Sequence, residues 1–60
     1  MKIWVNGRAA ELLPGMTVRH ALIQLDLLRD LEEGKAVYDE WGNQVGLEGA
    51  VEDEQRFEVK

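Results

Sequence analysis

The segment KIWVNGRAAEL at residues 2–12 decides the fold of this chain. Its first half alternates in hydropathy with a period of two, as expected of a half-buried strand. Ile3 and Val5 therefore fall on one face of the strand, and Trp4 falls on the other. The Asn-Gly pair at 6–7 predicts a tight hairpin turn, because a type I′ turn needs positive φ at both central residues.

The hairpin returns over residues 8–13 and brings Ala10 and Leu12 to the face that carries Ile3. Alternation along the returning strand makes this face the apolar one. The Pro-Gly pair at 14–15 then ends the strand. The hairpin should therefore present one buried face and one face with Trp4.

A helix is expected to start just after Thr17, which is a suitable N-cap residue. The apolar residues that follow have the i, i+3, i+4, i+7 spacing of a helix with one buried stripe: Val18, Ala21, Leu22 and Leu25. Residues 26–33 remain helix-like, with Leu28 and Leu31 as their apolar positions. Gly34 is expected at the position that follows the helix C-terminus.

The rest of the chain reads as short strands and turns. Residues 36–38 and 44–46 are expected to be strands joined by the turn DEWGN at 39–43. Residues 47–54 are turn-like. Residues 56–59 form a last strand with Phe57 facing inward, because RFEVK at 56–60 alternates charged and apolar residues.

This order of elements predicts one domain over residues 1–60. A hairpin is followed by a helix that crosses its face, and the last strand returns parallel to the first in a right-handed crossover. The expected fold class is α+β, with a β-grasp (ubiquitin-like) arrangement. In it, a mixed four- to five-stranded sheet carries one main helix on one face, and the other face is open.

Composition excludes several classes of function. Sixty residues support only a small core, and the absence of cysteine excludes disulfides and thiolate metal sites. The chain shows no membrane span and no signal-peptide hydrophobic region, so we expect a cytoplasmic protein. The net charge of −5 argues against nucleic acid. An acidic surface suits a basic protein partner, or it only keeps the domain soluble.

No residue pattern predicts catalysis, a metal or another cofactor. His20 is the single histidine and falls off the core stripe, where we expect an exposed side chain without a nucleophile nearby. The carboxylate runs at 39–40 and 52–54 lack the alternating spacing and glycine of a cation loop. We expect these runs to be solvated turns.

Trp4 is the strongest candidate for binding a protein partner. It is expected on the open face, and aromatic and arginine side chains are enriched at interface hot spots. The alternative is that its ring packs on the stems of Lys2, Arg56 or Lys60. Tyr38 and Trp41 would extend the same patch, although Trp41 could instead fold back over the rim of the core. The candidate partner-binding set is Trp4, Tyr38, Trp41, Arg56 and Lys60.

The chain resembles the ThiS/MoaD-type sulfur carriers over most of its length. The resemblance is carried by MKIWVNGRAAEL at 1–12, the Pro-Gly pair, TVRHALIQL at 17–25, AVYDEWGNQV at 36–45 and VEDEQRFEV at 51–59. It implies a ubiquitin-like fold and a partner that is either an E1-like adenylating enzyme or a synthase subunit. In these carriers the open sheet face docks on the activating enzyme.

One departure bears on function. The carriers of this family end in a flexible Gly-Gly tail whose carboxylate is adenylated and converted to a thiocarboxylate, whereas this sequence ends at Lys60. A carboxylate held at the sheet rim beside a β-branched residue could hardly reach a nucleotide. The expected function is protein binding through the open face, without sulfur-carrier activity. The alternatives are a carrier in thiamin or molybdopterin synthesis whose tail lies beyond this sequence, and an accessory subunit of a larger enzyme.

Overall fold

The Asn-Gly hairpin forms as the sequence predicts. In the computed structural model, which describes residues 1–60, Asn6 and Gly7 both have positive φ (53° and 80°). They join antiparallel strands in which Ile3 lies opposite Ala10. The elements in chain order are β1 (Lys2–Val5), β2 (Arg8–Glu11), α1 (Val18–Gln24), α2 (Leu28–Glu32), β3 (Val37–Asp39), β4 (Gln44–Val45) and β5 (Arg56–Val59).

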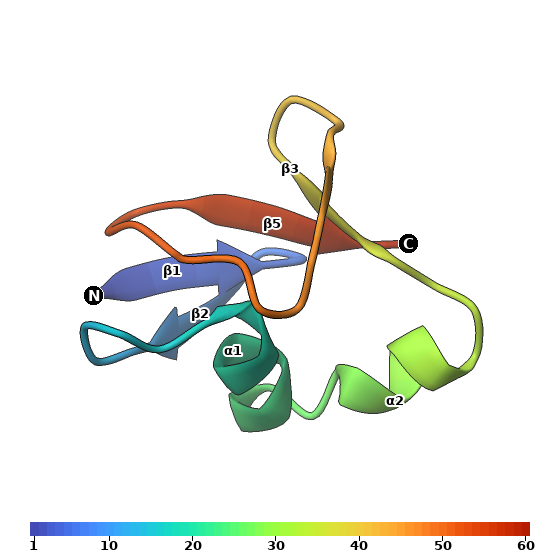
Figure 1. Ribbon diagram of the computed structural model, residues 1–60, viewed down its shortest axis with the longest axis horizontal. Coiled ribbons are helices and arrows are strands. Elements are labelled where there is room, and N and C mark those ends of the chain that lie inside the picture. Colours follow the sequence, from blue (N-terminus) through green and yellow to red (C-terminus); the bar gives the residue numbers. More distant parts are fainter.

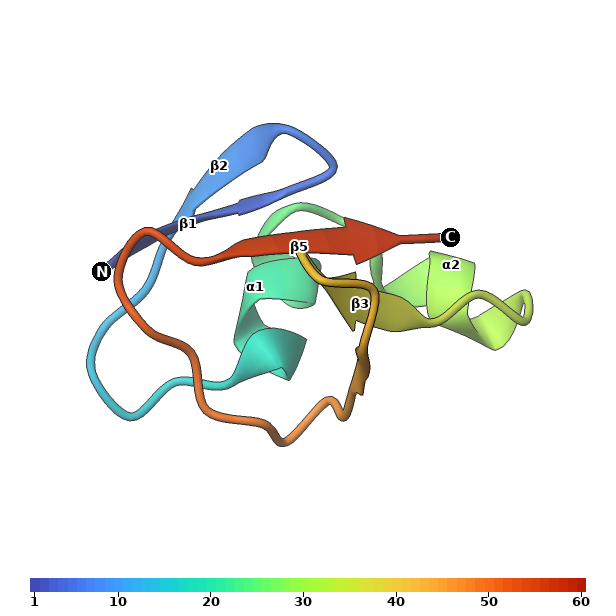
Figure 2. The same cartoon turned by 90° about the horizontal axis from the view of Figure 1, so that it is seen from above.

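The five strands form one mixed sheet in the order β2-β1-β5-β3-β4. The central pair, β1 and β5, is parallel, and the other neighbouring pairs are antiparallel. Both helices lie on the same side of the sheet (Figure 1). Seen from above, β1 and β5 run side by side over α1 (Figure 2). The domain is therefore a small α+β fold, and its arrangement is compatible with a β-grasp.

The core lies between α1 and the inner face of the sheet. The apolar positions predicted for the hairpin and for α1 are all buried, and so is Phe57. Val51, in the loop before β5, was not predicted as a core residue and is also buried. The full set is Ile3, Val5, Ala10, Leu12, Val18, Ala21, Leu22, Leu25, Val37, Val51, Phe57 and Val59.

The prediction of one main helix is wrong, because the helical region is divided into two short helices. Asp26 has a φ of 59°, which ends α1. The Leu27 N–H then donates to the Leu22 carbonyl at 2.8 Å, and the Asp26 N–H donates to that of Ile23 at 3.2 Å. These bonds are those of a Schellman motif with an aspartate at its left-handed position. Gly34, with a φ of 100°, ends α2 as predicted.

The loop between β4 and β5 completes the first turn of α1. The Val18 N–H donates to the Gly49 carbonyl at 3.2 Å, and the Arg19 N–H donates to the Leu47 carbonyl at 2.9 Å. These amides have no partner within the helix, so the loop satisfies donors that would otherwise be free. An ion pair between Arg19 and Glu48 (2.7 Å) joins the same two segments. Neither helix is long and apolar enough to cross a bilayer.

Candidate partner-binding face

Trp4 lies on the sheet face away from the helices, as the alternation in β1 predicts. Its strand neighbour in β5 is Arg56. The guanidinium carbon of Arg56 lies 4.6 Å from the centre of a Trp4 ring, and the Lys2 Nζ lies 5.8 Å from it. Both distances are within the range of a cation–π contact. The ring therefore packs on Lys2 and Arg56, as the alternative prediction for Trp4 stated, whereas Lys60 lies beside Tyr38. We call Lys2, Trp4 and Arg56 the Trp4 cluster.

A second cation–aromatic pair lies on β3 and the end of β5. Tyr38 is opposite Glu58 in the antiparallel register, so both side chains leave the same face of the sheet. The Nζ of Lys60 lies 5.4 Å from the centre of the Tyr38 ring. We call Tyr38 and Lys60 the Tyr38 pair. The open face therefore carries two half-buried aromatic rings, each beside a cation.

The cations of the open face are free of ion pairs. The three ion pairs of the domain are formed by Arg19, Lys35 and the N-terminal amine. Lys2, Arg56 and Lys60 form none, although the chain has twelve carboxylates. Each of these three side chains is exposed. Their positive charges remain available to a ligand.

Trp41 lies apart from both groups, in the turn between β3 and β4. The Oδ1 of Asp39 accepts hydrogen bonds from the Trp41 N–H (3.0 Å) and the Asn43 N–H (2.9 Å), and Gly42 has a φ of 84°. These contacts hold the turn and leave 74% of the Trp41 surface exposed. Trp41 does not fold over the core. It borders a shallow hollow whose other lining residues include Glu40, Glu52, Asp53 and Glu54.

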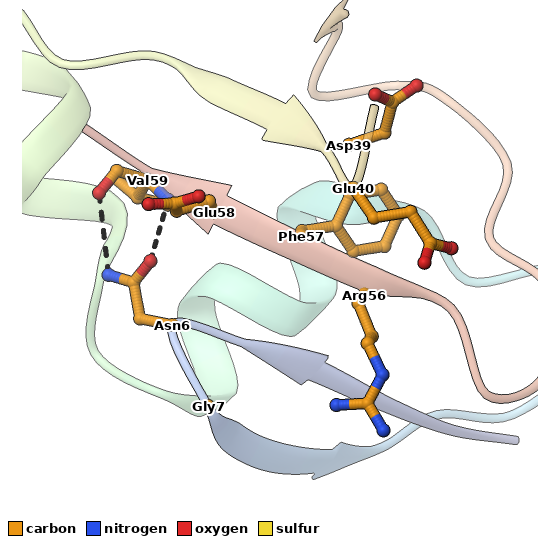
Figure 3. A pocket seen from close by; sticks show the side chains of 8 residues that line it. All are labelled: Asn6, Gly7, Asp39, Glu40, Arg56, Phe57, Glu58 and Val59. Carbon is orange, nitrogen blue, oxygen red and sulfur yellow. Dashed lines mark hydrogen bonds between the residues drawn. The ribbon is translucent and has the colours of Figure 1, made fainter. Parts of the chain in front are cut away.

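A shallow hollow lies over β5, between the two hairpin turns. Asp39 and Glu40 line it on one side of β5, and Asn6 and Gly7 line it on the other (Figure 3). Arg56 and Glu58 complete its polar lining. Arg56 of the Trp4 cluster therefore shares this hollow with three carboxylates, those of Asp39, Glu40 and Glu58.

Asn6 has a structural role that sequence reasoning missed. Its Oδ1 accepts a hydrogen bond from the Val59 N–H at 2.8 Å, and its Nδ2 donates to the Val59 carbonyl at 3.4 Å (Figure 3). β1 ends at Val5, so the Asn6 side-chain amide forms the hydrogen bonds to Val59 that a longer β1 would form. Asparagine at this turn position was the available signal in the sequence. It did not reveal the contact with Val59, because asparagine is already favoured there by the turn itself.

His20 caps α1. Its Nδ1 accepts a hydrogen bond from the Thr17 N–H at 2.9 Å and lies 3.2 Å from the Thr17 Oγ1. The side chain is exposed, as expected. In this position histidine takes the part that Glu or Gln has in a capping box. No group of three or more His, Asp or Glu side chains is arranged to hold a metal ion.

The five predicted partner-binding residues therefore lie in three places. Trp4 and Arg56 are together, Tyr38 and Lys60 are together, and Trp41 is in a separate acidic hollow. Comparisons with protein-family models, curated proteins and solved structures found no match. The likeness to the sulfur carriers consequently depends on the sequence segments quoted above, and the open face is the candidate site on geometric grounds.

Proposed function

We propose that this chain is a non-enzymatic β-grasp domain that binds a partner protein through the open face of its sheet. The Trp4 cluster is the observation that carries the proposal. Tryptophan and arginine are among the residue types most enriched at interface hot spots, and here the two lie together on neighbouring strands of the open face. The resemblance to the sulfur carriers suggests that the partner is an E1-like adenylating enzyme or a synthase subunit.

The geometry of the face supports a protein ligand in preference to a small molecule. The hollow over β5 is open and has only two apolar residues in its lining, Phe57 and Val59, whose side chains are buried in the core. Small-molecule sites are usually concave and mostly apolar. A face that carries two half-buried aromatic rings and an exposed arginine is more typical of a surface that another protein covers, because interfaces are enriched in aromatic residues and arginine.

Photocrosslinking in cells that express the gene tests the proposal. A benzophenone amino acid replaces Gln44, which is opposite Tyr38 in β4 and shares its face. The matched control replaces Ile23, which is 56% exposed on the helical side. We expect one protein to be crosslinked from position 44 and not from position 23.

The crosslinked protein is then purified and its affinity for the native chain is compared with that for Trp4→Ala. We expect affinity to fall by at least about tenfold, which corresponds to roughly 1.4 kcal/mol. Equal crosslinking from both positions, or unchanged affinity after Trp4→Ala, would refute binding through this face. Circular dichroism confirms that each variant is folded.

A further inference from the structure

The open face differs in charge from the rest of the domain. Alternation and strand register place three cations on it, Lys2, Arg56 and Lys60, and two carboxylates, Glu11 and Glu58. The chain as a whole has twelve acidic and seven basic residues. Glu40, which follows β3 and lines the hollow with Arg56, adds a third carboxylate, so the face is close to neutral and its positive charge is concentrated at Lys2 and Arg56, on a protein whose net charge is −5.

The position of these cations is specific to the face. Lys2 and Arg56 lie beside the same ring, on neighbouring strands, and neither forms an ion pair. An exposed cation stacked on an aromatic ring keeps part of its hydrogen-bonding surface free. The guanidinium can therefore donate to a carboxylate while its face stays on Trp4.

We infer that the partner contributes an acidic segment to the Trp4 cluster, with carboxylates at Lys2 and Arg56 and an apolar side chain beside Trp4. The inference rests on the proposed function and names the chemistry of the partner. Charge complementarity supports it, because interfaces match positive patches with negative ones. Lys60, beside Tyr38, provides a further positive site on the same face.

A nucleic acid is a poorer match to the same surface. Glu58 lies between Arg56 and Lys60 along β5, and Asp39 and Glu40 line the hollow beside it. A phosphate backbone brings a regular row of negative charges, so it would meet these carboxylates. An acidic protein segment can place its few carboxylates only where the cations are.

An NMR titration of the full chain with two synthetic peptides tests the inference. One is a short acetylated and amidated peptide of alternating Glu and Leu, and the other has Lys in place of Glu. We expect the acidic peptide to shift the Trp4 indole N–H and the amides of β1 and β5. We also expect binding to weaken as salt is added, because the contacts are between exposed charges.

Matched charge variants distinguish a specific effect of the Trp4 cluster from a general effect of the protein's net charge. Lys2→Gln together with Arg56→Gln should weaken binding of the acidic peptide at least about tenfold. Arg29→Gln together with Lys35→Gln also removes two exposed cations, from α2 and the loop that follows it, and should change the affinity less than about twofold, since α2 lies on the helical side.

The alternative outcomes have distinct meanings. If the Lys peptide binds the face as tightly as the Glu peptide, or if the acidic peptide causes no shift, the acidic partner is ruled out while docking of a protein still stands on the crosslinking result. If an oligothymidine shifts the Trp4 indole and neither peptide does, the inference is overturned in favour of nucleic acid. If positions 44 and 23 crosslink equally, the proposed function itself is refuted, whatever the peptide titrations show.

Discussion

The side-chain amide of Asn6 makes two hydrogen bonds to the backbone of Val59, one to its N–H at 2.8 Å and one to its carbonyl at 3.4 Å. β5 extends beyond the end of β1, and Val59 would otherwise present an unpaired amide to that gap. Gln24 does the same for the outer edge of β2: its side chain accepts from the Glu11 N–H and donates to the Glu11 carbonyl, both at 2.8 Å. Each of these two side-chain amides thus forms the pair of backbone hydrogen bonds that a neighbouring strand would form.

Replacement of Asn6 by glycine should destabilise the domain. Glycine adopts the φ of 53° without strain but removes both bonds to Val59. We expect the free energy of unfolding to fall by about 1 kcal/mol. The loss of the two hydrogen bonds should outweigh the gain from removing backbone strain at this positive φ. Urea denaturation measures it.

Asp26→Gly is the matched control, because Asp26 has a similar φ of 59° and its side chain makes no hydrogen bond or ion pair. Glycine is the preferred residue at this position of a Schellman motif. We expect stabilisation by about 0.5 kcal/mol. If both variants move in the same direction, the Asn6 bonds do not contribute to stability.

Loss of the Gln24 amide should expose the edge of β2. In Gln24→Ala, the Glu11 N–H and carbonyl lose their side-chain partners, which should lower the free energy of unfolding by about 1 kcal/mol. An unpaired edge also promotes pairing with another chain. Sedimentation velocity should show more self-association than in the native chain, and an unchanged monomer would contradict the edge-blocking role.

The capping role of His20 predicts different effects for two substitutions. His20→Ala removes the acceptor of the Thr17 N–H and should cost about 0.5–1 kcal/mol. His20→Gln restores an acceptor at the same position of the capping box and should recover most of that loss. Thermal unfolding of the three proteins checks this, and equal stability of the Ala and Gln variants would show that the bond is unimportant.

The stacking of Arg56 on Trp4 should be visible by NMR. The ring current of Trp4 should move the side-chain protons of Arg56 upfield, and Trp4→Leu should abolish that shift. Arg29, on α2, is the internal reference and should not change. Arg56→Gln should cost about 0.5–1 kcal/mol of stability. Identical Arg56 shifts in the native chain and in Trp4→Leu would exclude the stacked arrangement in solution.

Several elements could be predicted because their signals are local. The Asn-Gly turn, the Thr17 cap and Gly34 each satisfy a backbone requirement that few residue types can meet. The apolar stripe of α1 and the alternation in β1 and β5 follow from the periods of helix and strand, and the buried residues agree with them. The open-face position of Trp4 came from the same alternation.

The break at Asp26 could not be predicted in this way. Glycine is the usual residue with positive φ at the end of a helix, and neither glycine nor proline marks the end of α1. The two residues after the break, Leu27 and Leu28, pack against the core. Local propensity therefore favoured a continuous helical region, and tertiary packing divided it.

The sequence by itself determined the hairpin, the inner and outer faces of its strands and the start of the first helix, since these depend on contacts between residues close in the chain. Tertiary structure alone decided which distant residues meet. Of the three cations named from the sequence, it brought Lys2 and Arg56 to Trp4 and Lys60 to Tyr38. It also joined Asn6 to Val59 and left Trp41 apart, because the order of strands in a sheet depends on pairing across long loops. Such pairing is set by burial of the whole core, which no short segment encodes.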